Sequence, residues 1–193
     1  MQTSKSIKII IGLVCVIWIA TIVGCFETAV NVPLKNYQPQ IGGSDFSAYK
    51  GKPVYLMNFE NEANDTTMWA YLSPDKKFSY SNDNVLQNYF WYAFQNAFSN
   101  LGMAVSRMDN PDVMAPAMWV TLTSITDVNF QVKVTVQKKG ITVFTQQYAI
   151  QEPPPAEADR NPAALEARAY NMTSKLIATI LKDPGFQKAV TGA

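Results

Sequence analysis

Apolar and polar residues alternate with different periods along the chain, and each period predicts a different kind of element. Between Asn129 and Gln137, Phe and Val occupy every second position, with Gln, Lys and Thr between them. This alternation predicts a β-strand with one buried face. Further strands are predicted at 53–60, 103–108, 118–126 and 141–150. The residues Lys138-Lys139-Gly140 separate the last two strands and predict a hairpin turn.

Two longer segments have apolar residues three or four positions apart, which predicts amphipathic helices. The first begins at Asn84, which forms a capping box with Gln87, and ends at Gly102. The second has Asn161 as its cap and Pro162 in its first turn, and Pro184 ends it. The expected core positions are Leu86, Phe90, Phe94, Ala97 and Leu101 in the first helix and Leu165, Ala169, Met172, Leu176 and Ile180 in the second.

A second apolar stripe on the first helix is the main candidate for a contact surface. Val85, Tyr89 and Tyr92 lie outside the core stripe, among Asn and Ser residues. The segment 61–80 has no clear period and is expected to form a long, partly buried loop. Either this loop covers the stripe, or the stripe joins Trp69 and Tyr71 in an exposed patch that contacts a partner or lipid.

The elements follow the order strand, long loop, helix, two strands, hairpin and helix. An antiparallel sheet of four to five strands with both amphipathic helices on one face would bury the apolar face of every predicted strand and helix. The expected fold class is therefore a two-layer α+β domain, with Trp119 in its core. Asp127 stands either in a turn or in a bend of one long strand.

The first residues have the order of a targeting segment. Lys5 and Lys8 precede an uncharged apolar run from Ile9 to Gly24, as in a secretory signal peptide. As a helix this run would be about 24 Å long, against a hydrocarbon core of about 30 Å, so a short membrane anchor is the alternative. Either reading leaves the two lysines on the cytoplasmic side.

The end of this run carries a more specific signal. The residues Ile22-Val23-Gly24-Cys25 resemble the lipobox of bacterial lipoproteins. The resemblance implies that residues 1–24 are removed, that the sulfur of Cys25 receives a diacylglyceryl group, and that its new amine is acylated, for example with palmitate. Two or three acyl chains on one residue hold a protein at a membrane essentially permanently. Phe26 stands where Asp would retain an enterobacterial lipoprotein at the inner membrane, which favours the outer membrane.

Three regions follow from these patterns. Residues 1–24 are expected to be a signal peptide, 25–50 a lipidated N-terminus with a flexible tether, and 51–193 a single periplasmic α+β domain. The tether is rich in Asn, Gln, Pro and Gly and has few apolar residues. Cys15 would be removed with the signal peptide, which leaves Cys25 without a disulfide partner.

Composition narrows the chemistry that the domain could perform. The sequence contains no histidine, the commonest general base and metal ligand, so neither a metal site nor a cofactor is expected. The 16 Lys and Arg residues balance 15 Asp and Glu residues without forming a basic patch, so no nucleic-acid partner is expected. Glu60, Glu62 and Asp65 cluster after the first strand. A carboxylate-dependent hydrolase would need such a cluster and is a further hypothesis. A solvated acidic loop is the simpler explanation, because no basic residue or histidine stands beside these carboxylates.

The layout of the chain resembles that of known envelope lipoproteins. A lipobox, a tether, a first strand, the helical segment NVLQNYFWYAFQNAFSNLGM, a strand meander and a closing helix follow one another. In this order they are similar to the small lipoproteins of the YajG type and to the auxiliary lipoproteins of ABC-type lipid-transport systems. The resemblance implies a non-enzymatic periplasmic domain at the outer membrane that assists a transport or assembly machine. It assigns no binding residue except the lipidated Cys25.

The sequence therefore predicts a membrane-anchored accessory or binding module, with an envelope protein complex or acyl chains as its partner. The alternative is a structural subunit of an envelope-spanning assembly or secretion complex. Such a subunit would pack through a sheet edge or through the hairpin at Lys138–Gly140.

Overall fold

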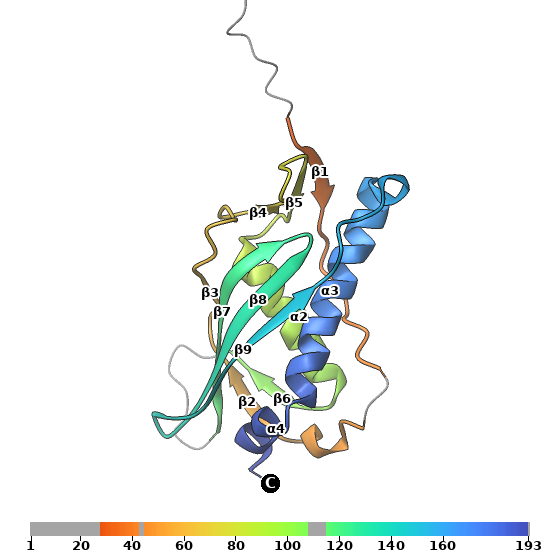
Figure 1. The fold of residues 1–193 in the computed structure, drawn as a ribbon. Coiled ribbons are helices and arrows are strands. Elements are labelled where there is room, and N and C mark those ends of the chain that lie inside the picture. The colour runs from red at the N-terminus through yellow and green to blue at the C-terminus, as the bar shows by residue number, and fades with distance from the viewer. Residues whose placement is uncertain (1–27, 43–44, 108–114, 193) are drawn as a thin grey trace, which may run out of the picture.

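The computed structural model describes residues 28–42, 45–107 and 115–192. In these ranges nine strands form two mixed sheets, and the α-helices α2, α3 and α4 lie against them (Figure 1). The expected two-layer fold with one antiparallel sheet of four to five strands is therefore wrong in the number of strands, the number of sheets and the direction of the strands. The predicted signal peptide and Cys25 lie outside the described residues.

The larger sheet has the strand order β6-β2-β7-β8-β9, with β3 paired to β7 off this path. Its strands are β2 (Pro53–Leu56), β3 (Glu60–Asn61), β6 (Ala104–Ser106), β7 (Ala117–Thr126), β8 (Asn129–Lys138) and β9 (Ile141–Gln151). β2 runs parallel to both β6 and β7, and β3 runs parallel to β7. The last three strands form an antiparallel meander. The parallel pairing was missed because strands as short as β2, β3 and β6 show no period that reveals their neighbours.

The hairpin between β8 and β9 has the turn that the sequence predicts. Lys139 and Gly140 both have positive φ, 52° and 74°, as a type I′ turn requires. Val132, Val134 and Val136 of β8 are fully buried on one face. Near the turn, a register shift between Val136 and Gln137 gives β9 one extra residue.

The smaller sheet has the order β1-β5-β4, and the sequence did not predict it. β1 (Val30–Pro33) runs parallel to β5 (Phe78–Ser81), whereas β4 (Ala70–Leu72) runs antiparallel to β5. Within the range of the expected tether, 25–50, β1 and the short 3₁₀ helix η1 (Ser47–Tyr49) belong to the fold, and Val32 and Tyr49 are fully buried. The expected loop 61–80 is wrong, because it supplies β4 and β5.

α2 (Leu86–Asn100) ends as predicted but begins differently. Its N-cap is Val85, and no side chain accepts a hydrogen bond there, so the predicted cap at Asn84 is wrong. A distant carbonyl takes that role, since the Leu86 amide donates to the Met68 carbonyl at 2.9 Å. Gly102 follows the helix with φ of 78°, as predicted for its closing residue.

α3 (Pro162–Lys182) begins where the sequence predicts. Asn161 Oδ1 accepts a hydrogen bond from the Ala164 amide at 3.0 Å, and Pro162 stands in the first turn. Pro184 then opens a further helix, α4 (Pro184–Thr191). Asp183 caps α4, because its Oδ1 accepts from the Gly185 and Phe186 amides at 2.7 and 3.1 Å. α4 was missed because a proline after a long helix indicates a stop as readily as a new start.

The helices cover one face of the larger sheet, and the core lies between them and the strands. The ring of Phe130 on β8 lies 5.6 Å from that of Phe90 on α2 and 5.5 Å from that of Tyr71 on β4. One core therefore joins both sheets. Trp119 is opposite Thr135 on the other face of the sheet and is half-buried, so its expected core position is wrong.

Candidate functional site

Two of the five aromatic and aliphatic residues expected to form a contact surface are in the core. Tyr71 is fully buried and Tyr89 is 2 % exposed. Tyr71 stacks on Tyr80 with ring centroids 4.6 Å apart and an interplanar angle of 4°. The ring of Tyr37, from outside the segment 61–80, lies 6.3 Å from that of Tyr89. Tyr71 and Tyr89 therefore do not form part of an exposed patch.

The exposed remainder of the expected surface is smaller. Trp69 is 49 % exposed, its neighbour Met68 is 62 % exposed, and Val85 is half-buried. Met68 and Val85 come together because the Met68 carbonyl binds the amide of Leu86, the residue after Val85. We call Met68, Trp69 and Val85 the Met68–Trp69 patch. Tyr92 lies two turns further along α2, half-buried and edge-on to Trp91 at 5.2 Å.

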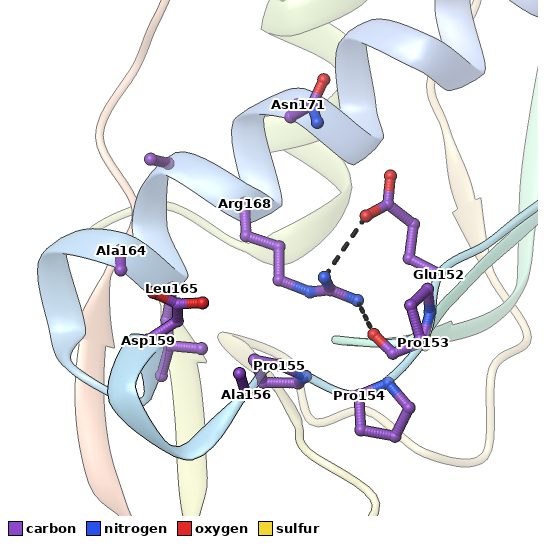
Figure 2. Close-up of a pocket in the computed structure, with 11 residues that line it drawn as sticks. Glu152, Pro153, Pro154, Pro155, Ala156, Asp159, Ala164, Leu165, Arg168 and Asn171 are labelled. Carbon is purple, nitrogen blue, oxygen red and sulfur yellow. Dashed lines mark hydrogen bonds and ion pairs between the residues drawn. The ribbon is translucent and has the colours of Figure 1, made fainter.

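One hollow in the described residues has a volume of about 580 Å³ (Figure 2). The end of β9, a proline-rich segment with the 3₁₀ helix η2 (Glu157–Asp159), and the first half of α3 enclose it. Its lining residues are Glu152, Pro153, Pro154, Pro155, Ala156, Asp159, Ala164, Leu165, Ala167, Arg168 and Asn171. Most of this wall is apolar, and three side chains carry charge.

Arg168 extends from α3 across the hollow and binds the opposite wall (Figure 2). Its Nη1 donates to Glu152 Oε2 at 3.3 Å and its Nη2 donates to the Pro153 carbonyl at 2.6 Å. Its Nε donates to the Asp127 carbonyl at 3.0 Å. Glu152 also accepts from Lys175 Nζ. These bonds tie three segments together, and in the described part of the chain Asp159 is left as the lining carboxylate without an ion pair.

Asp127 is a buried carboxyl that the sequence did not single out. It lies in the turn between β7 and β8 and is 3 % exposed. Its Oδ2 accepts from the Tyr80 hydroxyl at 3.1 Å, whereas Oδ1 has no partner among the described residues. Burial raises the pKa of Asp127, while the Tyr80 hydrogen bond and the nearby Arg168 act in the opposite direction. No sequence signal separates such a residue from a solvated turn aspartate.

The carboxylates after the first strand serve the fold. Asp65 accepts from the Ser124 hydroxyl at 2.8 Å and from the Ile125 amide at 3.0 Å, which fastens its loop to β7. Glu60 Oε2 accepts from the Thr121 hydroxyl at 3.4 Å. Across the described ranges no group of three His, Cys, Asp or Glu side chains could hold a metal ion.

The β8–β9 turn lies at the opposite end of the molecule from β1 (Figure 1). Beside it Ile141 is 69 % exposed and Val143 is 47 % exposed. A second hollow, of about 410 Å³, separates the hairpin from α4 and has Lys138 and Lys188 in its lining. Among the described residues no carboxylate lies within ion-pair distance of Lys138 or Lys139. We call residues 138–143 the hairpin tip.

None of the helices in the described ranges is long and apolar enough to cross a bilayer.

Comparison with known proteins identifies a similarity in fold. No protein-family model matches the chain, and no curated protein matches it. The crystal structure of protein XCC0632 from Xanthomonas campestris, described by the family model DUF330, is similar with a TM-score of 0.56. The similarity covers 81 % of this chain and 95 % of that one at 8 % sequence identity. Identity this low shows a shared fold and carries no activity or partner across.

Proposed function

We propose that the protein is a lipid-anchored, non-enzymatic accessory module on the periplasmic face of the outer membrane. The anchor is Cys25, acylated on its sulfur and amine, and the partner is an envelope protein complex or the acyl chains that it handles. The observation that carries this proposal is the position of β1, which begins only a few residues after the lipobox cysteine. The chain between Cys25 and Val30 spans at most about 18 Å, so the domain would lie close to the bilayer.

The first described segment is fixed to the body of the domain, which supports a defined orientation at the membrane. β1 pairs along its length with β5. Beyond it, the Lys35 amide donates to the Tyr170 hydroxyl at 2.9 Å, and the ring of Tyr37 stacks on that of Tyr170 at 4.3 Å. An anchor attached to so fixed an N-terminus would hold the β1 end toward the bilayer and the hairpin tip away from it.

The Met68–Trp69 patch is the contact surface that we assign to this module. Exposed Met and Trp side chains on a loop usually mark interaction surfaces, and Trp suits both protein and lipid interfaces because one edge is polar. The backbone of Trp69 is fixed, since its carbonyl accepts from the Asn82 amide at 3.3 Å. The patch therefore presents its apolar side chains without a large ordering cost on binding.

The chemistry of the hollows supports binding rather than catalysis. The sequence has no histidine, and the cation in the 580 Å³ hollow, Arg168, is held by three protein acceptors. The alternative, a structural subunit of an envelope assembly, is favoured by one observation: β9 is an unprotected edge of the larger sheet.

The anchor is tested on the full chain produced in a Gram-negative host. We expect intact-mass spectrometry to show an N-terminus at Cys25 carrying diacylglycerol and an amide-linked acyl chain, and labelled palmitate to enter the protein. Cys25→Ser should abolish labelling, whereas the matched control Cys15→Ser should leave it unchanged. Recovery of residues 1–24 on a protein with an unmodified Cys25 would disprove the anchor. Separation of the two membranes on a density gradient then tests the outer-membrane assignment.

The patch is tested by a photo-crosslinking residue in place of Trp69 in growing cells. We expect it to capture an envelope protein or phospholipid, and Met68→Ser to reduce the yield severalfold. The same crosslinker in place of Lys133, an exposed residue on the open face of β8, is the control and should capture neither. Equal yields at both positions would refute the patch as a specific surface.

A further inference from the structure

The two edges of the larger sheet differ in how they are protected. β6 forms one edge with three residues, a length too short to recruit another strand. β9 forms the other edge with eleven residues, Ile141–Gln151. No charged residue, proline or glycine occurs in it, although natural sheets usually place such residues on long edges to prevent pairing. The register shift near Val143 is its one irregularity, and 144–151 pair regularly with β8.

Most side chains of β9 are exposed, whereas those of its neighbour β8 are alternately buried. Among its residues only Tyr148 is buried, and Thr145, Gln146 and Gln147 at its centre are all exposed. Within the described residues no strand lies on its outer side. The strand therefore has an open row of backbone donors and acceptors about 35 Å long.

Among the described residues, the side chains beyond the two ends of β9 that have no ion pair carry charges of opposite sign. Before β9 stand Lys138 and Lys139, neither of which has an ion pair. After β9, Asp159 in the lining of the 580 Å³ hollow has no ion pair. Nearby, Glu157 is 91 % exposed on its side chain and lies 3.9 Å from Arg160 Nε, while Arg168 and Lys175 are paired with Glu152. A parallel pairing of two copies would bring lysines against lysines. An antiparallel pairing would bring the lysines of each copy against the carboxylates of the other, twice by symmetry.

We propose that β9 pairs antiparallel with the β9 of a second copy of this chain, so that the two larger sheets form one continuous sheet across a two-fold axis near Gln146. Each hairpin tip then lies at the mouth of the other copy's large hollow. There Ile141, 69 % exposed in one copy, meets the wall of Pro153, Pro154 and Pro155. This inference goes beyond the proposed function and does not rest on the anchor.

Single cysteines test the geometry. In the full chain, Gln146→Cys should form a disulfide-linked dimer under mild oxidation, because residues at the axis of an antiparallel pair are within disulfide distance. Thr145→Cys and Gln147→Cys should give lower yields on either side. The control Lys133→Cys, one strand further in, would be about 14 Å from its symmetry mate and should give none above the wild-type background. The absence of a dimer at all positions from 144 to 148 would overturn the proposal.

A charge exchange tests the direction of pairing. Sedimentation equilibrium of the full chain, lipidated and as Cys25→Ser, should show monomer and dimer and nothing larger. Lys138→Glu with Lys139→Glu should raise the dimer dissociation constant tenfold or more, and so should Asp159→Lys with Glu157→Lys. Combining all four changes should restore most of the affinity, while thermal unfolding confirms that each variant is folded.

Three results would overturn the proposal: a monomer at all concentrations up to 100 µM, an open series of larger oligomers, or no rescue by the combined charge exchange. Disulfide capture of another protein by Gln146→Cys, without self-capture, would assign the edge to that partner's strand instead. Because dimerisation is measured with and without Cys25, its failure is distinguishable from failure of the anchor.

Discussion

The two sheets of the molecule are stabilised in different ways. β7, β8 and β9 are long, follow one another in the chain, and pair through regular backbone ladders. The strands of the smaller sheet have three or four residues each, and β1 joins the neighbouring strands β4 and β5 from a distant part of the chain. Side-chain hydrogen bonds add to their short backbone ladders: Asn82 Nδ2 donates to the Leu34 carbonyl, and the Tyr80 hydroxyl donates to Asp127.

The comparison distinguishes two kinds of structure. Some strands can be predicted from the residues next to them in the sequence, whereas others are stabilised by segments far away in the chain. In the β7–β8–β9 meander, strands that are neighbours in the sequence are also neighbours in the sheet. In the smaller sheet a residue such as Tyr71 is buried because Tyr80 and Phe130 lie on either side of it. Four experiments test how far local patterns and distant contacts contribute independently to stability.

The largest effect is expected where the two sheets meet. Phe130→Ala removes a fully buried ring that contacts both Phe90 and Tyr71. The lost burial and the cavity should lower the free energy of unfolding by about 3–5 kcal/mol, measured by urea denaturation. Lys133→Ala, on the open face of the same strand, is the control and should change it by less than about 0.5 kcal/mol. Two separate transitions would show that the sheets unfold independently and contradict a shared core.

A pair of tyrosines tests the polar dependence of the smaller sheet. Tyr80→Phe leaves Asp127 without its hydroxyl donor and should cost about 1–3 kcal/mol in urea denaturation. Tyr71→Phe removes a buried hydroxyl that has no partner among the described residues, so stability should be unchanged or slightly higher. An equal loss of unfolding free energy in the two variants would mean that the Tyr71 hydroxyl also makes a stabilising hydrogen bond.

The helix starts provide a smaller test of the same contrast. Asn161→Ala removes a side-chain cap and should cost about 1 kcal/mol in thermal or urea unfolding. Asn84→Ala removes the residue expected from sequence to cap α2, yet it should change stability by less than about 0.5 kcal/mol, because Met68 supplies the acceptor there. A larger loss of stability in Asn84→Ala than in Asn161→Ala would contradict the assignment of Asn161, and not Asn84, as a helix cap.

The smallest effect concerns pH. The pKa of Asp127 is raised above 3.8 in the folded state by burial, so the folded protein retains this proton to higher pH than the unfolded chain. The resulting stabilisation is complete below the unfolded pKa and is lost as pH rises through the folded pKa. Asp127→Asn should remove this decline from the stability profile, and the exposed control Asp83→Asn should keep it. Identical profiles for Asp127→Asn and wild type would contradict the assignment.

Sequence patterns therefore predicted the parts of the fold that are local. The meander, the turn at Lys139-Gly140 and the start of α3 at Asn161 all follow from residues that are near one another in the chain. The parallel pairing of β2 with β7 and of β1 with β5 joins remote segments of the chain, which no local periodicity indicates.

The candidate surface shows the same limit. The second stripe of α2 was visible in the sequence, but the burial of Tyr89 depends on Tyr37, β4 and α3. Trp69 and Val85 remained accessible, whereas Tyr71 and Tyr89 did not. Arg168 and Asp127 carried no sequence signal, because their roles arise from the corner at which three segments meet.

The contacts of the first described segment have a consequence for the timing of folding. Lys35 and Tyr49 find their hydrogen-bond partners, Tyr170 and Leu181, more than 130 residues further on. These two contacts therefore form only after the final third of the chain has been synthesised, and contacts of such long range slow folding. Under the proposed export route this delay would be useful, since a domain that cannot complete its fold until its last helices emerge can still be threaded through a membrane.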